Sequence, residues 1–63
     1  MYVKIIYKPN NDAFGYESRE YNKVQNILST VDGMSIEHSK NVYDVYLHKQ
    51  IHSVEIRQEK PDN

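Results

Sequence analysis

An Asp-Gly pair between two apolar residues, Val-Asp-Gly-Met at positions 31–34, constrains this chain more than any other feature. Such a pair, flanked by alternating apolar residues, is a strong signal for a two-residue β-hairpin, because a type I′ turn needs positive φ at both central positions. A turn centred on Asp32 and Gly33 sets Ile27 opposite His38. The segments on either side are therefore predicted to be paired antiparallel strands.

A second alternating run, residues 43–47, can pair back through a turn at residues 40–41. This register sets Val45 opposite Ile36. Side chains on a strand alternate between the two faces of a sheet, so the pairing decides which residues share the core face. The predicted core face of these strands consists of Ile27, Val31, Met34, Ile36, Tyr43, Val45 and Leu47.

Residues 17–31 support two interpretations. As a helix, the segment places Tyr21, Val24, Leu28 and Val31 at spacings of three and four. As strands, its alternation breaks once, between Tyr21 and Val24, which a bulge would repair. We favour strands, because the segment is poor in strong helix formers and leads directly into the Asp-Gly turn.

The predicted fold class is all-β, a small antiparallel meander of five or six strands with the layout of an SH3-like barrel. A short 3₁₀ turn is expected just before the last strand, where the alternation is lost. Strands are expected near residues 2–8, 17–22, 25–31, 34–39, 42–48 and 52–57. The alternative is an α+β fold with a helix at 18–30 on a four-strand sheet. Residues 1–57 are predicted to form a single small β domain, and residues 58–63 a disordered polar tail.

The chain has 63 residues and no cysteine, so disulfides and cysteine-type zinc sites are excluded. A core of this size seldom supplies more than about 3–5 kcal/mol of net stability. Tight β packing or self-association is therefore expected to stabilise the domain.

The formal net charge is −1, which argues against a general binder of the nucleic-acid backbone. The sequence holds no apolar run of about 18 residues and no basic-then-apolar leader, so neither a membrane segment nor secretion is expected. We expect a cytoplasmic protein with no membrane partner.

Aromatic residues are predicted on the face opposite the core as well. Asp44 lies on the same side, opposite Glu37 in the expected register, and such a like-charge pair favours a nearby cation. Tyrosine is enriched at protein interfaces. We therefore predict a protein-binding site that consists of Tyr2, Val42, Asp44 and Tyr46.

No catalytic, cofactor-binding or metal-binding residue is predicted. His48 and His52 have a spacing that binds zinc on one helical turn, but this stretch resembles a turn that leads into a strand. Gly15 and Gly33 are too far apart for a phosphate-binding loop. The carboxylates are scattered, and the serines lack the context of a nucleophile elbow.

Asparagine, lysine, isoleucine and tyrosine occur six times each, while alanine occurs once, which is typical of a low-GC genome. Together with an opening strand at 2–7, an Asn-x-Val-x-x-Ile step at 22–27 and a tail at 43–56, this pattern resembles small uncharacterised phage and prophage proteins of low-GC Gram-positive bacteria. That group has no catalytic signature, so the resemblance implies no functional residue.

Two functions follow as hypotheses. The first is a non-enzymatic protein-binding module, a phage accessory protein in the host cytoplasm that docks on a host or phage protein or self-associates. The alternative is a small-barrel nucleic-acid-binding protein. Only analogy of fold supports the alternative, and the net charge opposes it.

Overall fold

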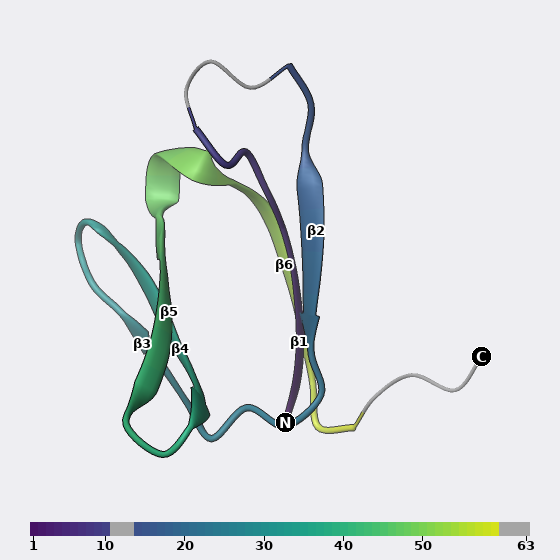
Figure 1. Cartoon of the computed structure of the whole chain (residues 1–63), viewed down its shortest axis with the longest axis vertical. Helices are drawn as coiled ribbons and strands as arrows, with labels where there is room; N and C mark the ends of the chain where they lie inside the picture. The colour runs from purple at the N-terminus through teal and green to yellow at the C-terminus, as the bar shows by residue number, and fades with distance from the viewer. Residues whose placement is uncertain (11–13, 60–63) are drawn as a thin grey trace.

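The computed structural model describes residues 1–10 and 14–59, which form two three-stranded antiparallel sheets that stand side by side (Figure 1). The first sheet has the order β2-β1-β6 and consists of β1 (Tyr2–Tyr7), β2 (Glu17–Tyr21) and β6 (Ile51–Arg57). The second has the order β3-β4-β5 and consists of β3 (Asn26–Ser29), β4 (Gly33–Ser39) and β5 (Val42–Leu47). A 3₁₀ turn, η1 (His48–Gln50), joins β5 to β6. The prediction of an all-β fold is confirmed, and within the described ranges no ladder closes the two sheets into a barrel.

The segment that allowed a helix forms strands instead. β2 and β3 occupy its two halves, and the chain between them is irregular at residues 22–25. The break falls where the alternation fails, between Tyr21 and Val24. The helix of the α+β alternative at 18–30 is therefore wrong. Residues 60–63 of the expected polar tail lie outside the part of the chain described here.

The core lies between the sheets, because each sheet turns one face toward the other. β1 contributes Val3 and Ile5, both fully buried, which suits their β-branched side chains. Ile36 of β4 is fully buried from the opposite side. The buried cluster consists of Val3, Ile5, Tyr21, Val24, Met34, Ile36 and Tyr46.

The first hairpin turns one residue earlier than predicted. Thr30 donates its backbone N–H to the Gly33 carbonyl at 2.8 Å, so the central turn residues are Val31 and Asp32. Ile27 therefore pairs with Ile36, not with His38. No described glycine has positive φ, so the expectation of a type I′ turn at Gly33 is wrong.

Gly33 is needed for a different reason, which is the close approach of β5. A Cβ atom at this position would overlap the carbonyl oxygen of Tyr46 and lie 3.2 Å from the Leu47 Cα. Glycine in a strand often marks such a backbone approach. The glycine of the Asp-Gly pair is therefore required, but by the packing of β4 against β5 and not by the turn.

A β-bulge at His38 shifts the second hairpin. Ser39 pairs with Val42, whereas Glu37 pairs with Tyr43, so His38 is the extra residue on β4. Beyond the bulge the register is offset by one residue, and a one-residue offset moves every side chain of a strand to the other face. The predicted orientation of β5 is therefore wrong: it turns Asp44 and Tyr46 inward.

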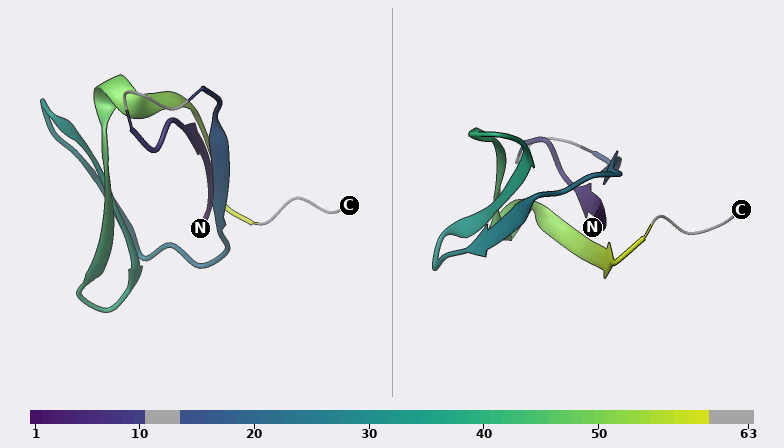
Figure 2. Two further views of the ribbon diagram at one scale, coloured as in Figure 1. Left: turned by 45° about the horizontal axis from the view of Figure 1, so that its top comes forward. Right: turned by 90° about the horizontal axis from the view of Figure 1, so that it is seen from below.

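The earlier turn of the first hairpin and the offset in the second together redistribute the predicted core face. Met34 and Ile36 are buried as expected, and Ile27 packs against the core. Four other members of that predicted face are exposed instead: Val31, Tyr43, Val45 and Leu47. Two further views show the β3–β4 hairpin projecting away from the first sheet (Figure 2).

Candidate functional site

Strand β5 presents two different faces, and each is a candidate for function. Its inward residues, Asp44 and Tyr46, belong to a polar cluster that connects the two sheets. Its outward residues belong to an apolar surface. Both arrangements follow from the register that the bulge at His38 sets.

The polar cluster centres on the Asp44 carboxylate. The Tyr21 hydroxyl donates to Asp44 Oδ2 at 2.5 Å and shares a 2.5 Å hydrogen bond with the Tyr46 hydroxyl. Because Tyr21 has one hydroxyl proton, Tyr46 is the donor of that second bond. Arg19 Nη1 lies 3.7 Å from Oδ2, and His38 Nε2 lies 3.3 Å from Oδ1. The cluster thus links β2 of the first sheet to β4 and β5 of the second.

Aromatic rings extend this connection. Tyr7 and Tyr46 pack edge to face with their ring centroids 4.8 Å apart, and the Tyr7 hydroxyl donates to Glu17 at 3.3 Å. The Arg19 guanidinium lies 5.7 Å from the centre of the Tyr21 ring. Such contacts add to the area that each ring buries. Of these contacts, the one between the rings of Tyr7 and Tyr46 joins β5 to the first sheet.

The contacts of the cluster shift the pKa values of Asp44 and Tyr21 in opposite directions. The hydrogen bond from Tyr21 is the main cause that lowers the pKa of Asp44 below its ordinary value of 3.8, with further lowering by His38 and Arg19 and an opposing effect of burial. Burial, followed by the hydrogen bond to Asp44, raises the pKa of Tyr21. At neutral pH the carboxylate is ionised and the phenol keeps its proton, an arrangement that suits holding strands together.

A pH prediction follows from this cluster. The pKa of Asp44 is lower in the folded chain than in the unfolded chain. The stabilisation that Asp44 gives the fold is therefore complete at a pH above its ordinary pKa, and it is lost as the pH falls through the pKa of the folded chain. We expect the free energy of unfolding to fall between roughly pH 5 and pH 2, and Asp44→Asn to reduce that slope. Tyr21→Phe removes the hydrogen bond that is the main cause of the lowered pKa of Asp44. The pKa of Asp44, measured by NMR titration, should therefore rise in this variant. An unchanged pKa in Tyr21→Phe would contradict the hydrogen-bonded cluster.

The other side of the second sheet exposes large apolar side chains on its two flanking strands, with Ser35 and Glu37 of β4 between them. Leu28 of β3 is 59% exposed and Val45 of β5 is 65% exposed, and both flank Ser35 of β4 in one cross-strand row. We name this surface the outer face and define it by Leu28, Tyr43, Val45 and Leu47. Val31, at the tip of the β3–β4 hairpin, borders the outer face and is 95% exposed.

The predicted binding residues do not share one surface. Tyr2 and Tyr46 are 3% and 5% exposed, so their placement on an exposed face is wrong. Burial and a hydrogen bond to Glu20 raise the pKa of Tyr2. Val42 is exposed, and Asp44 lies half-buried in the polar cluster. The binding role of these four residues stays a prediction.

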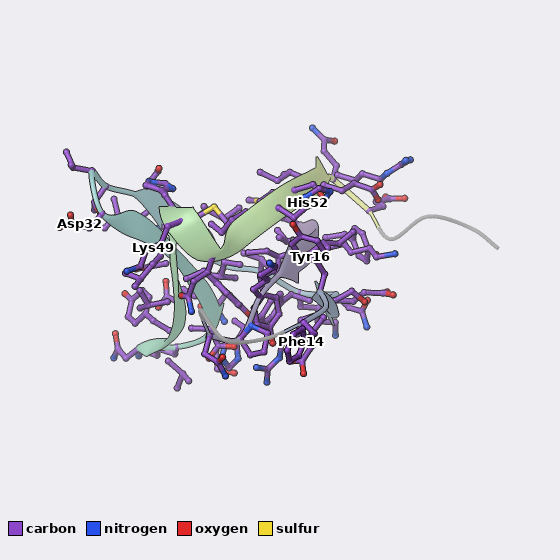
Figure 3. All side chains as sticks on the ribbon, turned by 90° about the horizontal axis from the view of Figure 1, so that it is seen from above. Phe14, Tyr16, Asp32, Lys49 and His52 are labelled. Atoms are coloured by element: carbon purple, nitrogen blue, oxygen red, sulfur yellow. The ribbon has the colours of Figure 1, made fainter. Side chains whose placement is uncertain are left out.

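The two histidines with zinc-like spacing have separate partners. His48 Nε2 lies 2.6 Å from the Thr30 carbonyl oxygen, while the His52 ring lies against Tyr16 with centroids 4.6 Å apart. In a view from above, His52 and Tyr16 lie far from Lys49, which neighbours Asp32 at the opposite end (Figure 3). Across residues 1–10 and 14–59, no group of three potential ligands is placed to hold a metal ion.

Sequence reasoning missed the outer face because it assigned most of those residues to the core. The outer face arises from a single extra residue in β4, and no residue type in the sequence indicates a bulge at that position.

Comparison with protein-family models, with curated proteins and with solved structures finds no match to this chain. Nowhere in the described ranges does a helix have the length and apolar character to cross a membrane.

Proposed function

We propose that this protein is a non-enzymatic protein-binding module that contacts its partner through the outer face. The observation that carries the proposal is the grouping of four large apolar side chains, each at least 41% exposed, on one side of one sheet. Large apolar side chains that are grouped and exposed on one face mark interaction sites. The partner it fits is a protein surface with apolar side chains, not a polyanion, because the acidic Glu37 lies on the same face opposite Tyr43.

Strand β5 is fixed by contacts on the side opposite the outer face. Asp44 and Tyr46 fix β5 from its inner side, so Tyr43, Val45 and Leu47 are presented from a strand that cannot rotate freely. A surface on a rigid element loses less conformational entropy when it binds. This arrangement supports a preformed contact surface.

We further propose that the layout is that of an SH3-like barrel, with β2 and β3 as two halves of one bent strand. The 3₁₀ turn directly before the final strand supports this assignment. The setting we propose is that of a phage or prophage accessory protein acting in the host cytoplasm, on the basis of the low-GC composition and strand pattern.

Photo-crosslinking tests the proposed contact surface. A benzophenone amino acid in place of Val45 should yield covalent adducts in expressing cells, because it stands on the outer face. The same group in place of Ser53, an exposed residue of β6 in the other sheet, is the matched control and should yield few. Equal adducts from both positions, or none from position 45, would overturn the proposal.

A further inference from the structure

One cross-strand row of the outer face carries a negative charge. Glu37 of β4 stands between Asn26 of β3 and Tyr43 of β5, which are its paired residues in the two ladders. Directly opposed residues on one face of an antiparallel pair have their Cβ atoms about 4.5–5.5 Å apart. Tyr43 is 51% exposed, so its ring and the Glu37 carboxylate stand side by side at the surface.

The β4–β5 turn holds this carboxylate in place. Asn41, which has a positive φ of 62°, donates its backbone N–H to Glu37 Oε2 at 2.9 Å. Within the described ranges, none of the ion pairs includes Glu37. The residue is half-buried, and a carboxylate that has lost part of its water is stabilised by a cation. The row is therefore prepared to receive a positive group from outside.

The inner side of the same strand shows how this chain pairs such groups. Arg19 lies 3.7 Å from the Asp44 carboxylate, and its guanidinium lies 5.7 Å from the centre of the Tyr21 ring. One guanidinium can contact both groups, because it is planar, always charged and able to stack on aromatic rings. Glu37 and Tyr43 present the same two groups on the outer side. In the part of the chain that the structure describes, no cation lies over the Tyr43 ring.

An apolar row lies next to the charged one. Leu28 and Val45 flank Ser35, two residues further along each strand. Two residues of a strand span about 7 Å. An extended segment also places its side chains i and i+2 on one side at this spacing. A segment with a cation and an apolar residue two positions apart therefore fits both rows.

We propose that the outer face binds a protein segment in which an arginine and a large apolar residue stand two positions apart, an inference that rests on the proposed protein-binding function. The arginine pairs with the Glu37 carboxylate and stacks on the Tyr43 ring. The apolar side chain packs between Leu28 and Val45. Lysine fits less well, because its compact ammonium lacks the planar fork that binds a carboxylate with two parallel N–H groups.

An NMR titration of the full chain with short peptides tests the arginine. The peptide acetyl-Arg-Ser-Leu-amide should shift the backbone amide signals of Glu37 and Tyr43. Its citrulline analogue keeps the shape of the side chain without the charge, and its lysine analogue keeps the charge without the planar fork. Each analogue should bind several-fold more weakly. Binding of either analogue as tight as that of the arginine peptide, or binding by none of the three, would overturn the inference.

Variants of the chain locate the contact. Glu37→Gln should abolish the preference for arginine over citrulline, and Tyr43→Leu, which keeps an apolar side chain without a ring, should reduce it. Glu55→Gln on β6 is the matched control, because that carboxylate already pairs with Arg57 at 3.0 Å. Circular dichroism checks that each variant is folded. A preference that survives Glu37→Gln, or that Glu55→Gln lowers equally, would overturn the inference.

Photo-crosslinking from position 45 separates this inference from the proposed function. Glu37→Gln should lower the yield of the adduct formed in cells several-fold, whereas Glu55→Gln should leave it unchanged. An adduct whose yield does not respond to Glu37→Gln would overturn the arginine contact while leaving the protein-binding function standing. The absence of any adduct would overturn the protein-binding function, and this inference with it.

Discussion

Replacing Gly33 with valine should lower the free energy of unfolding by about 3 kcal/mol, most of what a domain of this size has. The reason is steric, because the new Cβ would overlap the Tyr46 carbonyl oxygen and press on the Leu47 backbone. Backbone atoms in a paired strand cannot move aside without breaking the ladder. Urea denaturation followed by circular dichroism measures the loss.

Gly15 supplies the matched control. An added Cβ there meets no atom within 4 Å, so Gly15→Val should change the stability by no more than about 0.5 kcal/mol. Gly33→Ala carries the same Cβ as the valine and should already show much of the loss. Similar stabilities for the Gly15 and Gly33 variants would mean that β4 and β5 do not approach as described.

Tyr46→Ala should unfold the domain or nearly do so, with an expected loss of about 3–5 kcal/mol. This residue is 5% exposed, packs against Tyr7 and hydrogen-bonds to Tyr21. Val45→Ala, one position away and 65% exposed, should stay within about 0.5 kcal/mol when measured on the monomer.

The conservative variant Tyr46→Phe separates ring from hydroxyl. It keeps the packing against Tyr7 and loses one hydrogen bond, so its expected loss is about 1 kcal/mol. Thermal unfolding at low protein concentration measures all three variants. A stable Tyr46→Ala together with an unstable Val45→Ala would restore the orientation of β5 that the sequence pattern predicted.

The strands and the two hairpins of the second sheet were predictable from the sequence, but the residue register within those hairpins was not. Alternation in residues 2–7 and 34–38 correctly identified strands, and the loss of alternation after Leu47 correctly identified a short turn before β6. These features depend on local residue types, which a single sequence displays directly.

The faces of β5 depend on one unpaired residue. His38 is the extra residue of the bulge, and its Nε2 lies 3.3 Å from Asp44 Oδ1, a contact between residues that only the folded chain brings together. Without the bulge, Tyr43, Val45 and Leu47 form a convincing core pattern. The same apolar alternation is expected of a strand that contacts a partner, so sequence alone does not distinguish a core face from a binding face.

Thiol labelling of residue 45 tests most directly the claim that the outer face is open on a single copy and covered in a complex. The chain has no cysteine, so Val45→Cys and the control Ser53→Cys each carry one reporter. We expect both thiols to react rapidly on the purified chain at low micromolar concentration, and only the thiol at position 45 to be protected in expressing cells. A thiol at position 45 that reacts slowly on the purified chain, or as fast as the thiol at position 53 in the cells, would contradict the claim.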